Sequence, residues 1–216
     1  MNLKALPSVW SSEVFGFRVG TLDLWELPSI EKVKSENKGL FDVVFIKCQG
    51  WQDVDGVVAL DYLYDMERTV MPEEGKKPEV LKIQTVAGPR LTIAAEAFSD
   101  SRFLRDPELK SKAPKMYVRW VTENTPYVLW NTPNIGFLVP SRDSDGACRI
   151  SLLAISKEVR RAGIGKLLTS GVFAKEPGFW RVRVSSRNIN AIRFYETIGF
   201  RMKSVTTAFH VWMGKE

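Results

Sequence analysis

The sequence predicts an α/β protein in which helices cover a central sheet. Three observations support this class. Strand-like and helix-like segments alternate along the 216-residue chain. A strand at residues 150–155 passes through a glycine-containing turn into a helix that begins near Gly163. A second strand, residues 180–184, leads into a helix that Asn188 can cap at its start and that Gly199 can end.

The remaining elements follow from apolar periodicity and from turn residues. In the first part we expect a strand at 15–24, a helix at 28–37, a strand at 41–46, a helix at 54–64 and a short strand at 68–71. In the second part we expect strands at 80–86, 127–130, 135–139 and 149–155, and helices at 90–98 and 115–124.

A polar segment between two prolines, residues 72–78, is typical of a linker. It predicts two domains: a smaller α/β subdomain at residues 1–78 and a larger domain at residues 79–216.

Composition excludes several classes of function. With His210 as the single histidine and two cysteines, a metal site with three or four His/Cys ligands is not expected, and we predict no metal. His210 lies in a strand-like stretch and is expected to be a half-buried strand residue. No apolar run approaches the ~20 residues of a membrane span, and no apolar leader begins the chain, so we expect a cytoplasmic protein with no membrane partner.

The chain is basic: 31 Lys and Arg against 25 Asp and Glu give a net charge of +6. Such a charge fits an anionic ligand, although a solvated basic face is the commoner meaning. No Lys/Arg-rich run and no reader motif occurs, so nucleic acid is not expected as a partner.

Residues 160–165, Arg-Arg-Ala-Gly-Ile-Gly, are suited to binding an anion. The first N–H groups of a helix have no partner within the helix, and glycine lets a phosphate approach the backbone closely. Arg160, Arg161 and Lys166 add positive charge. An ordinary strand-to-helix turn explains the pattern equally well when it is taken alone, and the spacing is not that of a Walker A loop.

The two strand–helix segments together resemble the Gcn5-related N-acetyltransferase (GNAT) superfamily. Its signatures are R/Q-x-x-G-x-G/A and N-x-x-A-x-x-F/Y-Y-x-x-x-G-F. The matching residues are Arg160, Gly163 and Gly165 for the first, and Asn188, Ala191, Phe194, Tyr195, Gly199 and Phe200 for the second. Arg161 stands where many members have glycine. The resemblance covers residues 80–216 and implies a mixed sheet splayed between its fourth and fifth strands, with acetyl-CoA in the gap.

The resemblance also implies roles for individual residues. The N–H of Ile155 would polarise the thioester carbonyl, Asn188 would contact the cofactor arm, and Tyr195 would be the general acid. A tyrosine that packs in the core or against the sugar is the alternative for Tyr195. The other residues implied to bind the cofactor are Leu153, Ala154, Val159, Arg160, Arg161, Ala162, Gly163, Ile164 and Gly165. The general base is left open, with a water relay near Glu96, Asp100 or Asp145 as one option.

A narrower resemblance, to bacterial TDP-fucosamine acetyltransferases, rests on short segments at 10–16, 97–103 and 117–124. Those enzymes N-acetylate a TDP-linked 4-amino-4,6-dideoxygalactose and carry a partial GNAT-like subdomain ahead of the GNAT domain. The resemblance implies a nucleotide-linked amino-dideoxy sugar as acceptor, with Arg102, Tyr117 and Trp120 as candidate binding residues. The alternative is that the aromatic residues are core and Arg102 is a surface ion-pair partner.

Rival functions stay open at this point. The acceptor can be another amine, such as a protein N-terminus, a lysine, an aminoglycoside or a polyamine. A non-catalytic acyl-CoA-binding module is a third reading. A homodimer formed through exposed edge strands is also open.

Overall fold

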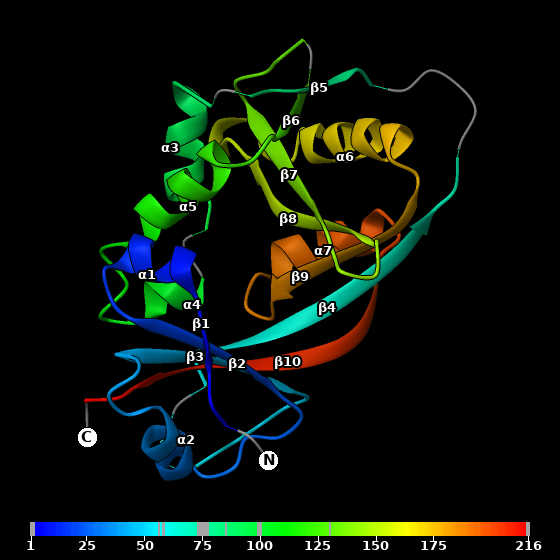
Figure 1. The fold of residues 1–216 in the computed structure, drawn as a ribbon. Coiled ribbons are helices and arrows are strands. Elements are labelled where there is room, and N and C mark those ends of the chain that lie inside the picture. The colour runs from blue at the N-terminus through cyan, green and yellow to red at the C-terminus, as the bar shows by residue number, and fades with distance from the viewer. Residues whose placement is uncertain are drawn as a thin grey trace.

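The computed structural model of the chain describes residues 3–55, 57, 59–72, 78–84, 86–98, 101–129 and 131–214. Ten strands of this part form one mixed sheet in the order β1-β2-β3-β10-β4-β9-β8-β7-β6-β5 (Figure 1). Their bounds are β1 Leu6–Pro7, β2 Val19–Leu24, β3 Val43–Gln49, β4 Asp61–Val70, β5 Val80–Lys82, β6 Tyr127–Leu129, β7 Gly136–Arg142, β8 Cys148–Ile155, β9 Gly178–Ser185 and β10 Arg201–Trp212.

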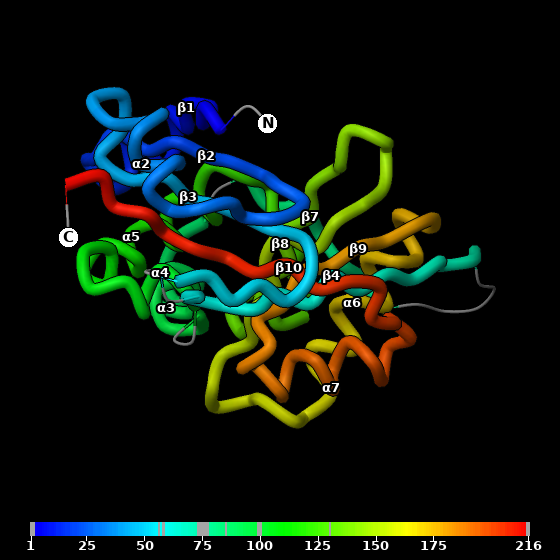
Figure 2. The backbone as a smooth tube through the Cα atoms, turned by 90° about the horizontal axis from the view of Figure 1, so that it is seen from below, coloured from blue at the N-terminus to red at the C-terminus, as the bar shows by residue number. Residues whose placement is uncertain are grey.

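Helices pack on both faces of the sheet. They are α1 Val9–Phe15, α2 Ile30–Asn37, α3 Pro89–Glu96, α4 Arg102–Arg105, α5 Ala113–Thr122, α6 Ile164–Lys175 and α7 Ile189–Thr197, with a 3₁₀ turn at Lys157–Val159. On one face, α1, α3, α4 and α5 bury a core against β3, β7 and β8. On the other face, α6 and α7 pack over β8, β9 and β4, while α2 packs over β2, β3 and β10 (Figures 1 and 2).

Strand β4 joins the two parts of the chain into one sheet. It lies between β9 and β10 and is antiparallel to both, pairing Leu63 with Ser185 on one side and with Thr206 on the other. The predicted boundary at residue 78 therefore falls between two strands of a shared sheet, and the division into two domains stays a prediction. Residues 73–77 of the expected linker lie outside the described residues.

The sheet opens between β8 and β9. These parallel strands pair only from Cys148 to Ile150, opposite Trp180 to Val182. On the other edge of β8 the register jumps from Val139↔Leu152 to Pro140↔Ile150, which leaves Ser151 as an extra residue. A bulge of this kind bends its strand, and the pairing with β9 ends at the same point. Strands β8 and β9 are the fourth and fifth strands of residues 79–216, so the predicted mixed sheet, splayed between its fourth and fifth strands, is confirmed.

Most predicted elements are present, but two predictions are wrong. Residues 61–70 form a strand and not the end of a helix at 54–64. This strand carries Asp65 and Glu67, whose charges are paired across the sheet with Arg183 and Arg181. Helix α1 covers residues 9–15, where no element was predicted before residue 15. It ends at Gly16, whose φ of +66° is a left-handed conformation that suits glycine, so the expected strand at 15–24 begins only at Val19.

Candidate active site

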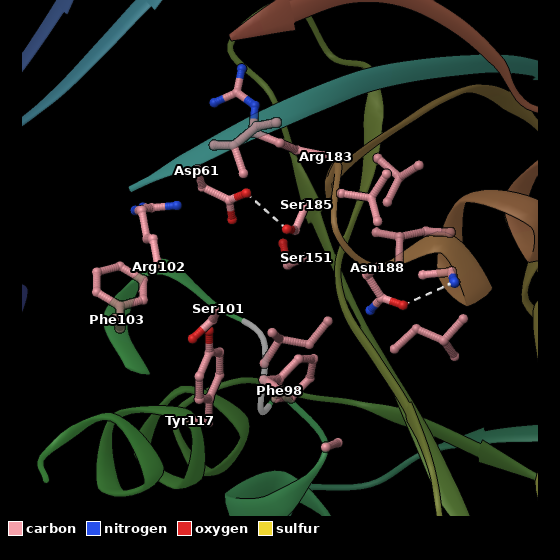
Figure 3. A pocket seen from close by; sticks show the side chains of 18 of the residues that line it. Asp61, Phe98, Ser101, Arg102, Phe103, Tyr117, Ser151, Arg183, Ser185 and Asn188 are labelled. Atoms are coloured by element: carbon pink, nitrogen blue, oxygen red, sulfur yellow. Dashed lines mark hydrogen bonds between the residues drawn. The ribbon is translucent and has the colours of Figure 1, made fainter. Parts of the chain in front are cut away.

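A cavity of about 460 Å³ lies where β8 and β9 diverge (Figure 3). A volume of this size suits a small-molecule ligand. The gap between β8 and β9 passes through the sheet, so residues from both faces of the sheet line the cavity. Among the lining residues are Lys47, Asp61, Phe98, Ser101, Arg102, Phe103, Tyr117, Trp120, Arg149, Ser151, Leu153, Arg183, Ser185, Asn188, Ala191 and Tyr195.

One wall of the cavity is aromatic. Tyr117 of α5 is buried, and its ring stacks on Phe98 with 4.4 Å between centroids and on Trp120 with 6.5 Å. Burial raises the pKa of Tyr117, so its hydroxyl stays protonated at neutral pH. Tyr117 and Trp120 are therefore both part of the core and part of the cavity wall.

Arg102 brings a positive charge into the same end of the cavity. The side chain is half-buried, its guanidinium lies 4.3 Å from the ring of Phe103, and burial lowers its pKa. No carboxylate of the described residues lies within ion-pair distance of it, so the surface ion pair that was the alternative is not formed. A desolvated guanidinium of this kind favours an anionic ligand.

Asp61 is a cavity residue that sequence reasoning missed. Its side chain is 2% exposed, its carboxylate accepts a hydrogen bond of 2.8 Å from Ser185 Oγ, and Oδ1 lies 3.3 Å from Arg105 Nη1. Figure 3 shows the carboxylate beside Ser185 and facing the cavity. The sequence placed Asp61 in an expected helix at 54–64. No local pattern could show that Ser185 and Arg105 lie next to it, because both are distant in the sequence.

Tyr195 of α7 and Asn188, the residue just before this helix, lie on the opposite side of the gap. Tyr195 is buried, with its ring in edge contact with Phe194 and Phe200, and burial raises its pKa. Asn188 caps the helix by accepting a hydrogen bond of 3.0 Å from the Ala191 N–H. Both residues line the cavity, together with Leu153 of β8.

The end of β8 leaves backbone groups without a partner strand. Ser156 N–H donates to Ile135 O at 2.8 Å, and hydrogen-bonding direction alternates along an antiparallel pair. Leu153 and Ile155 therefore direct their N–H groups away from β7, toward the side from which β9 has diverged. The side chain of Ala154 is buried in the core beneath α3–α5.

Some polar groups of the turn that follows β8 are already hydrogen-bonded within the turn. Val159 N–H donates to Ser156 O at 3.2 Å, and Arg160 Nε donates to Ile155 O at 3.0 Å. Arg161 and Ala162 are exposed. Arg161 has a φ of +67°, a left-handed conformation that no other non-glycine residue of the described chain adopts. Glycine adopts this conformation without strain, whereas an arginine is strained there.

The two glycines of the turn serve different purposes. Gly163 caps α6 with a φ of +80°, and a Cβ there would meet nothing within 4 Å, so only its conformation demands glycine. Gly165 lies in the first turn of α6, where a Cβ would come within 3.2 Å of the Phe194 ring. It allows close packing of α6 on α7. The first N–H that donates within the helix is that of Leu167, to Gly163 O at 3.0 Å, so the N–H groups of residues 164–166 stay available.

The carboxylates considered as aids to a base do not gather in the cavity. Glu96 pairs with Lys157 at 3.8 Å, and Asp145 pairs with Arg181 at 2.7 Å. Asp100 lies outside the described residues. In the described part of the chain no cluster of side chains could hold a metal ion, and none of its helices has the length and apolar character of a membrane span. The expectations of no metal, a cytoplasmic location and a homodimer stay predictions.

Part of this chain is similar to proteins of known family. Residues 110–211 match the acetyltransferase (GNAT) domain. The spore coat polysaccharide biosynthesis protein SpsD of Bacillus subtilis is 27% identical over 138 residues, which cover 57% of this chain and 47% of SpsD. The aligned region thus spans about half the length of that relative.

Two solved structures share the fold over most of their length. A GNAT-family protein of Novosphingobium aromaticivorans is 17% identical, with a TM-score of 0.54, and the match covers 84% of this chain and 78% of that one. A conserved protein of unknown function from Staphylococcus epidermidis is 10% identical, with a TM-score of 0.59, over 90% of this chain and 83% of that one. Residues 110–211 thus match a GNAT acetyltransferase domain, and the two solved structures share the fold of this chain.

Proposed function

We propose that the protein transfers an acetyl group from acetyl-CoA to the amine of a nucleotide-linked amino-dideoxy sugar, with a TDP-sugar as the first candidate. The observation that carries this proposal is the cavity at the β8–β9 gap. It joins an aromatic wall to a guanidinium that has no carboxylate partner among the described residues.

The acceptor end of the cavity suits the two parts of a nucleotide-sugar. The rings of Phe98, Tyr117 and Trp120 offer faces for a base or a sugar ring. Arg102 offers a charge-assisted donor for phosphate. SpsD belongs to polysaccharide biosynthesis, which is consistent with a sugar acceptor.

The donor end suits acetyl-CoA. The N–H groups at the start of α6, with Arg160 and Arg161 beside them, would hold its pyrophosphate. The outward N–H groups of Leu153 and Ile155 would pair with its extended arm, and the N–H of Ile155 would polarise the thioester carbonyl. Bound there, acetyl-CoA supplies an activated acetyl group.

Tyr195 is the proposed general acid. Its hydroxyl is protonated throughout the neutral range because burial raises its pKa. It lines the cavity together with Leu153, on the donor side of the acceptor wall. A neutral amine attacks the thioester carbonyl, and the departing thiolate takes the phenolic proton.

A thiol-release assay with a panel of acceptors tests this function. The panel holds TDP-4-amino-4,6-dideoxy sugars, free amino sugars, lysine peptides, polyamines and aminoglycosides. We expect turnover on the nucleotide-sugars and a KM for the acceptor that rises about 10- to 100-fold in Arg102→Leu. The KM for acetyl-CoA should stay unchanged in that variant.

Arg119→Gln is the matched control. Arg119 lies on α5 but pairs with Glu13 and Glu123, away from the cavity lining. Turnover on another amine alone would replace the proposed substrate. Binding of acetyl-CoA without turnover on any amine would favour the non-catalytic module.

A further inference from the structure

Acetylation of an amine leaves a proton that must be removed near the acceptor. At neutral pH an alkyl amine is an ammonium ion, which has no lone pair with which to attack. One of its protons must leave before the C–N bond forms, and the second is lost as the amide is made. Tyr195 supplies a proton to the thiolate and does not remove the first one.

Asp61 is the acidic side chain that the described cavity lining offers for this task. The 22 lining residues include several cations, Lys47, Arg102, Arg149 and Arg183, and no second carboxylate. A carboxylate that is 2% exposed is rare unless it is paired, and here its partners hold it in place. Three of these cations are already paired with acids outside the lining, Lys47 with Asp23, Arg149 with Asp143 and Arg183 with Asp65, so the carboxylate of Asp61 is the acidic group that an amine in the cavity would meet.

The surroundings of Asp61 fix the direction of its carboxylate. Ser185 Oγ donates to Oδ1 at 2.8 Å, and Arg105 Nη1 lies 3.3 Å from the same oxygen. Arg105 is itself anchored by donating to Leu60 O at 2.6 Å, one residue before Asp61. Figure 3 shows Asp61, Ser185 and Ser151 grouped along one side of the cavity, opposite Tyr117 and Phe98.

The position of Asp61 depends on strand β4 being inserted between β9 and β10. Leu63 of β4 pairs with Ser185, so Asp61 comes next to the end of β9, where the chain turns toward Asn188 and α7. The carboxylate thereby shares the cavity with Tyr195, which α7 carries. A proton acceptor and a proton donor lie in the walls of one cavity.

We propose that Asp61 binds the ammonium group of the acceptor and takes its first proton. The neutral nitrogen then forms a bond to the thioester carbon, and the C–S bond breaks. The thiolate takes the proton of Tyr195, and the second nitrogen proton restores the phenol as the amide forms. Asp61 releases its proton to solvent, so one acetyl group is transferred and one proton is set free. This inference rests on the proposed function and adds the acceptor-side catalytic residue.

The groups that face Asp61 decide how the test is designed. They are Arg102 and Arg105 of α4, Lys47 of β3, Arg183 of β9 and Tyr117 of α5. Burial raises the pKa of Tyr117, so its hydroxyl stays neutral at neutral pH. Burial lowers the pKa of Lys47, so Lys47→Met is included to show that the measured pH dependence does not come from this lysine.

The experiment measures kcat/KM against pH, from 6 to 10, with the panel amine that the enzyme acetylates best. An enzyme that carries its own proton acceptor can use the ammonium form. We expect a nearly flat profile for the native enzyme up to the pKa of the acceptor amine. In Asp61→Asn the rate should follow the free amine and rise about tenfold per pH unit, because only the deprotonated acceptor reacts.

The expected loss in Asp61→Asn is about 10²- to 10⁴-fold at pH 7 and less than about tenfold near the pKa of the amine. Glu67→Gln is the matched control. Glu67 is an acid on the same strand, paired with Arg181 outside the cavity lining, and its variant should keep the flat profile. Asp61→Glu should restore part of the flat profile. Retained acetyl-CoA binding in Asp61→Asn shows that the variant is folded.

The outcomes separate this proposal from the proposed substrate. A loss in Asp61→Asn that is equal at every pH, or a profile as flat as that of the native enzyme, overturns the role of Asp61. Turnover of a different amine with the steep profile supports Asp61 and overturns the nucleotide-sugar. If Asp61→Asn does not fold, Ser185→Ala keeps the carboxylate and loosens it, and it should lower kcat/KM at pH 7 more than at pH 9. Absence of turnover on every amine overturns both proposals.

Discussion

The two ends of the site that we propose, one for the acceptor and one for acetyl-CoA, are built in different ways. The acceptor end consists of side chains from five elements, β3, β4, β9, α4 and α5, that are far apart in the sequence. The donor end consists of Leu153, Asn188 and residues of α7 in the cavity lining and, beyond that lining, of the backbone of residues 154–165. The acceptor end carries full charges on Asp61 and Arg102, whereas the donor end offers N–H groups and the partial charge of a helix terminus.

In the proposed function, the backbone of the donor end binds the acetyl donor, and the side chains of the acceptor end decide which amine is acetylated. A backbone site depends on conformation and tolerates most side chains, so many sequences can keep the same donor. A site made of charged side chains in a desolvated cavity changes with each substitution, because every unpaired charge is costly there. We therefore expect donor-end variants to act through conformation or through one hydroxyl, and acceptor-end variants to act through charge.

The largest expected effect is a fall in kcat, and it tests Tyr195 at the donor end. Tyr195→Phe removes one hydroxyl and keeps the ring contacts with Phe194 and Phe200. If Tyr195 is the general acid, kcat should fall about 10²- to 10³-fold while the KM for both substrates changes little. Steady-state thiol release measures both constants. An unchanged kcat would leave Tyr195 as a packing residue and would remove the general acid from this end.

The second prediction concerns the support beneath the acceptor end. His210 of β10 lies against Phe103, whose ring also contacts Arg102, and His210 Nδ1 lies 2.7 Å from Asp106 Oδ2. Burial lowers the pKa of His210 to about 4, despite the hydrogen bond to Asp106 that acts to raise it. The unfolded chain, with a usual pKa near 6.5, therefore takes up a proton first as the pH falls.

Because the unfolded chain takes up the proton at a higher pH than the folded protein, acid lowers the free energy of unfolding. Stability is complete above pH 6.5 and is lost between pH 6.5 and 4, by about 3 kcal/mol. Denaturant unfolding at a series of pH values measures this loss. In His210→Asn, which keeps a donor toward Asp106, the loss over this window should be much smaller. Equal acid sensitivity in the variant would assign it to other groups.

The smallest expected effect tests conformation at the donor end. Arg161→Gly should raise the free energy of unfolding by about 0.5–1 kcal/mol, because the strain of a left-handed arginine is relieved. Gly163→Ala should lower it by about 1 kcal/mol through strain alone, since a methyl group there meets nothing within 4 Å. Thermal or denaturant unfolding measures whether each variant raises or lowers the free energy of unfolding. A lower stability for Arg161→Gly would mean that the arginine makes a stabilising contact.

Local sequence patterns were enough to predict the residues of the donor end. The spacing of Arg160, Gly163 and Gly165, and the cap at Asn188, lie within single strand–helix units, so short-range geometry decides them. The cavity also includes Arg102, Tyr117 and Trp120, which the sequence indicated through a narrower resemblance. Their place beside Asp61 and Ser185 was not predictable, because the proximity of side chains from α4, α5, β4 and β9 leaves no periodic signal in the sequence.

The sequence by itself determined the class: the strand–turn–helix motifs, the splayed sheet and the acetyltransferase signature. Only the tertiary structure decided where residues 61–70 go. Local composition favoured a helix in part of that segment, but insertion between β9 and β10 satisfies the backbone on both edges and pairs its acids with cross-strand arginines. The same insertion placed Asp61 beside Ser185, because a carboxylate's neighbours are set by strand register and not by its place along the chain.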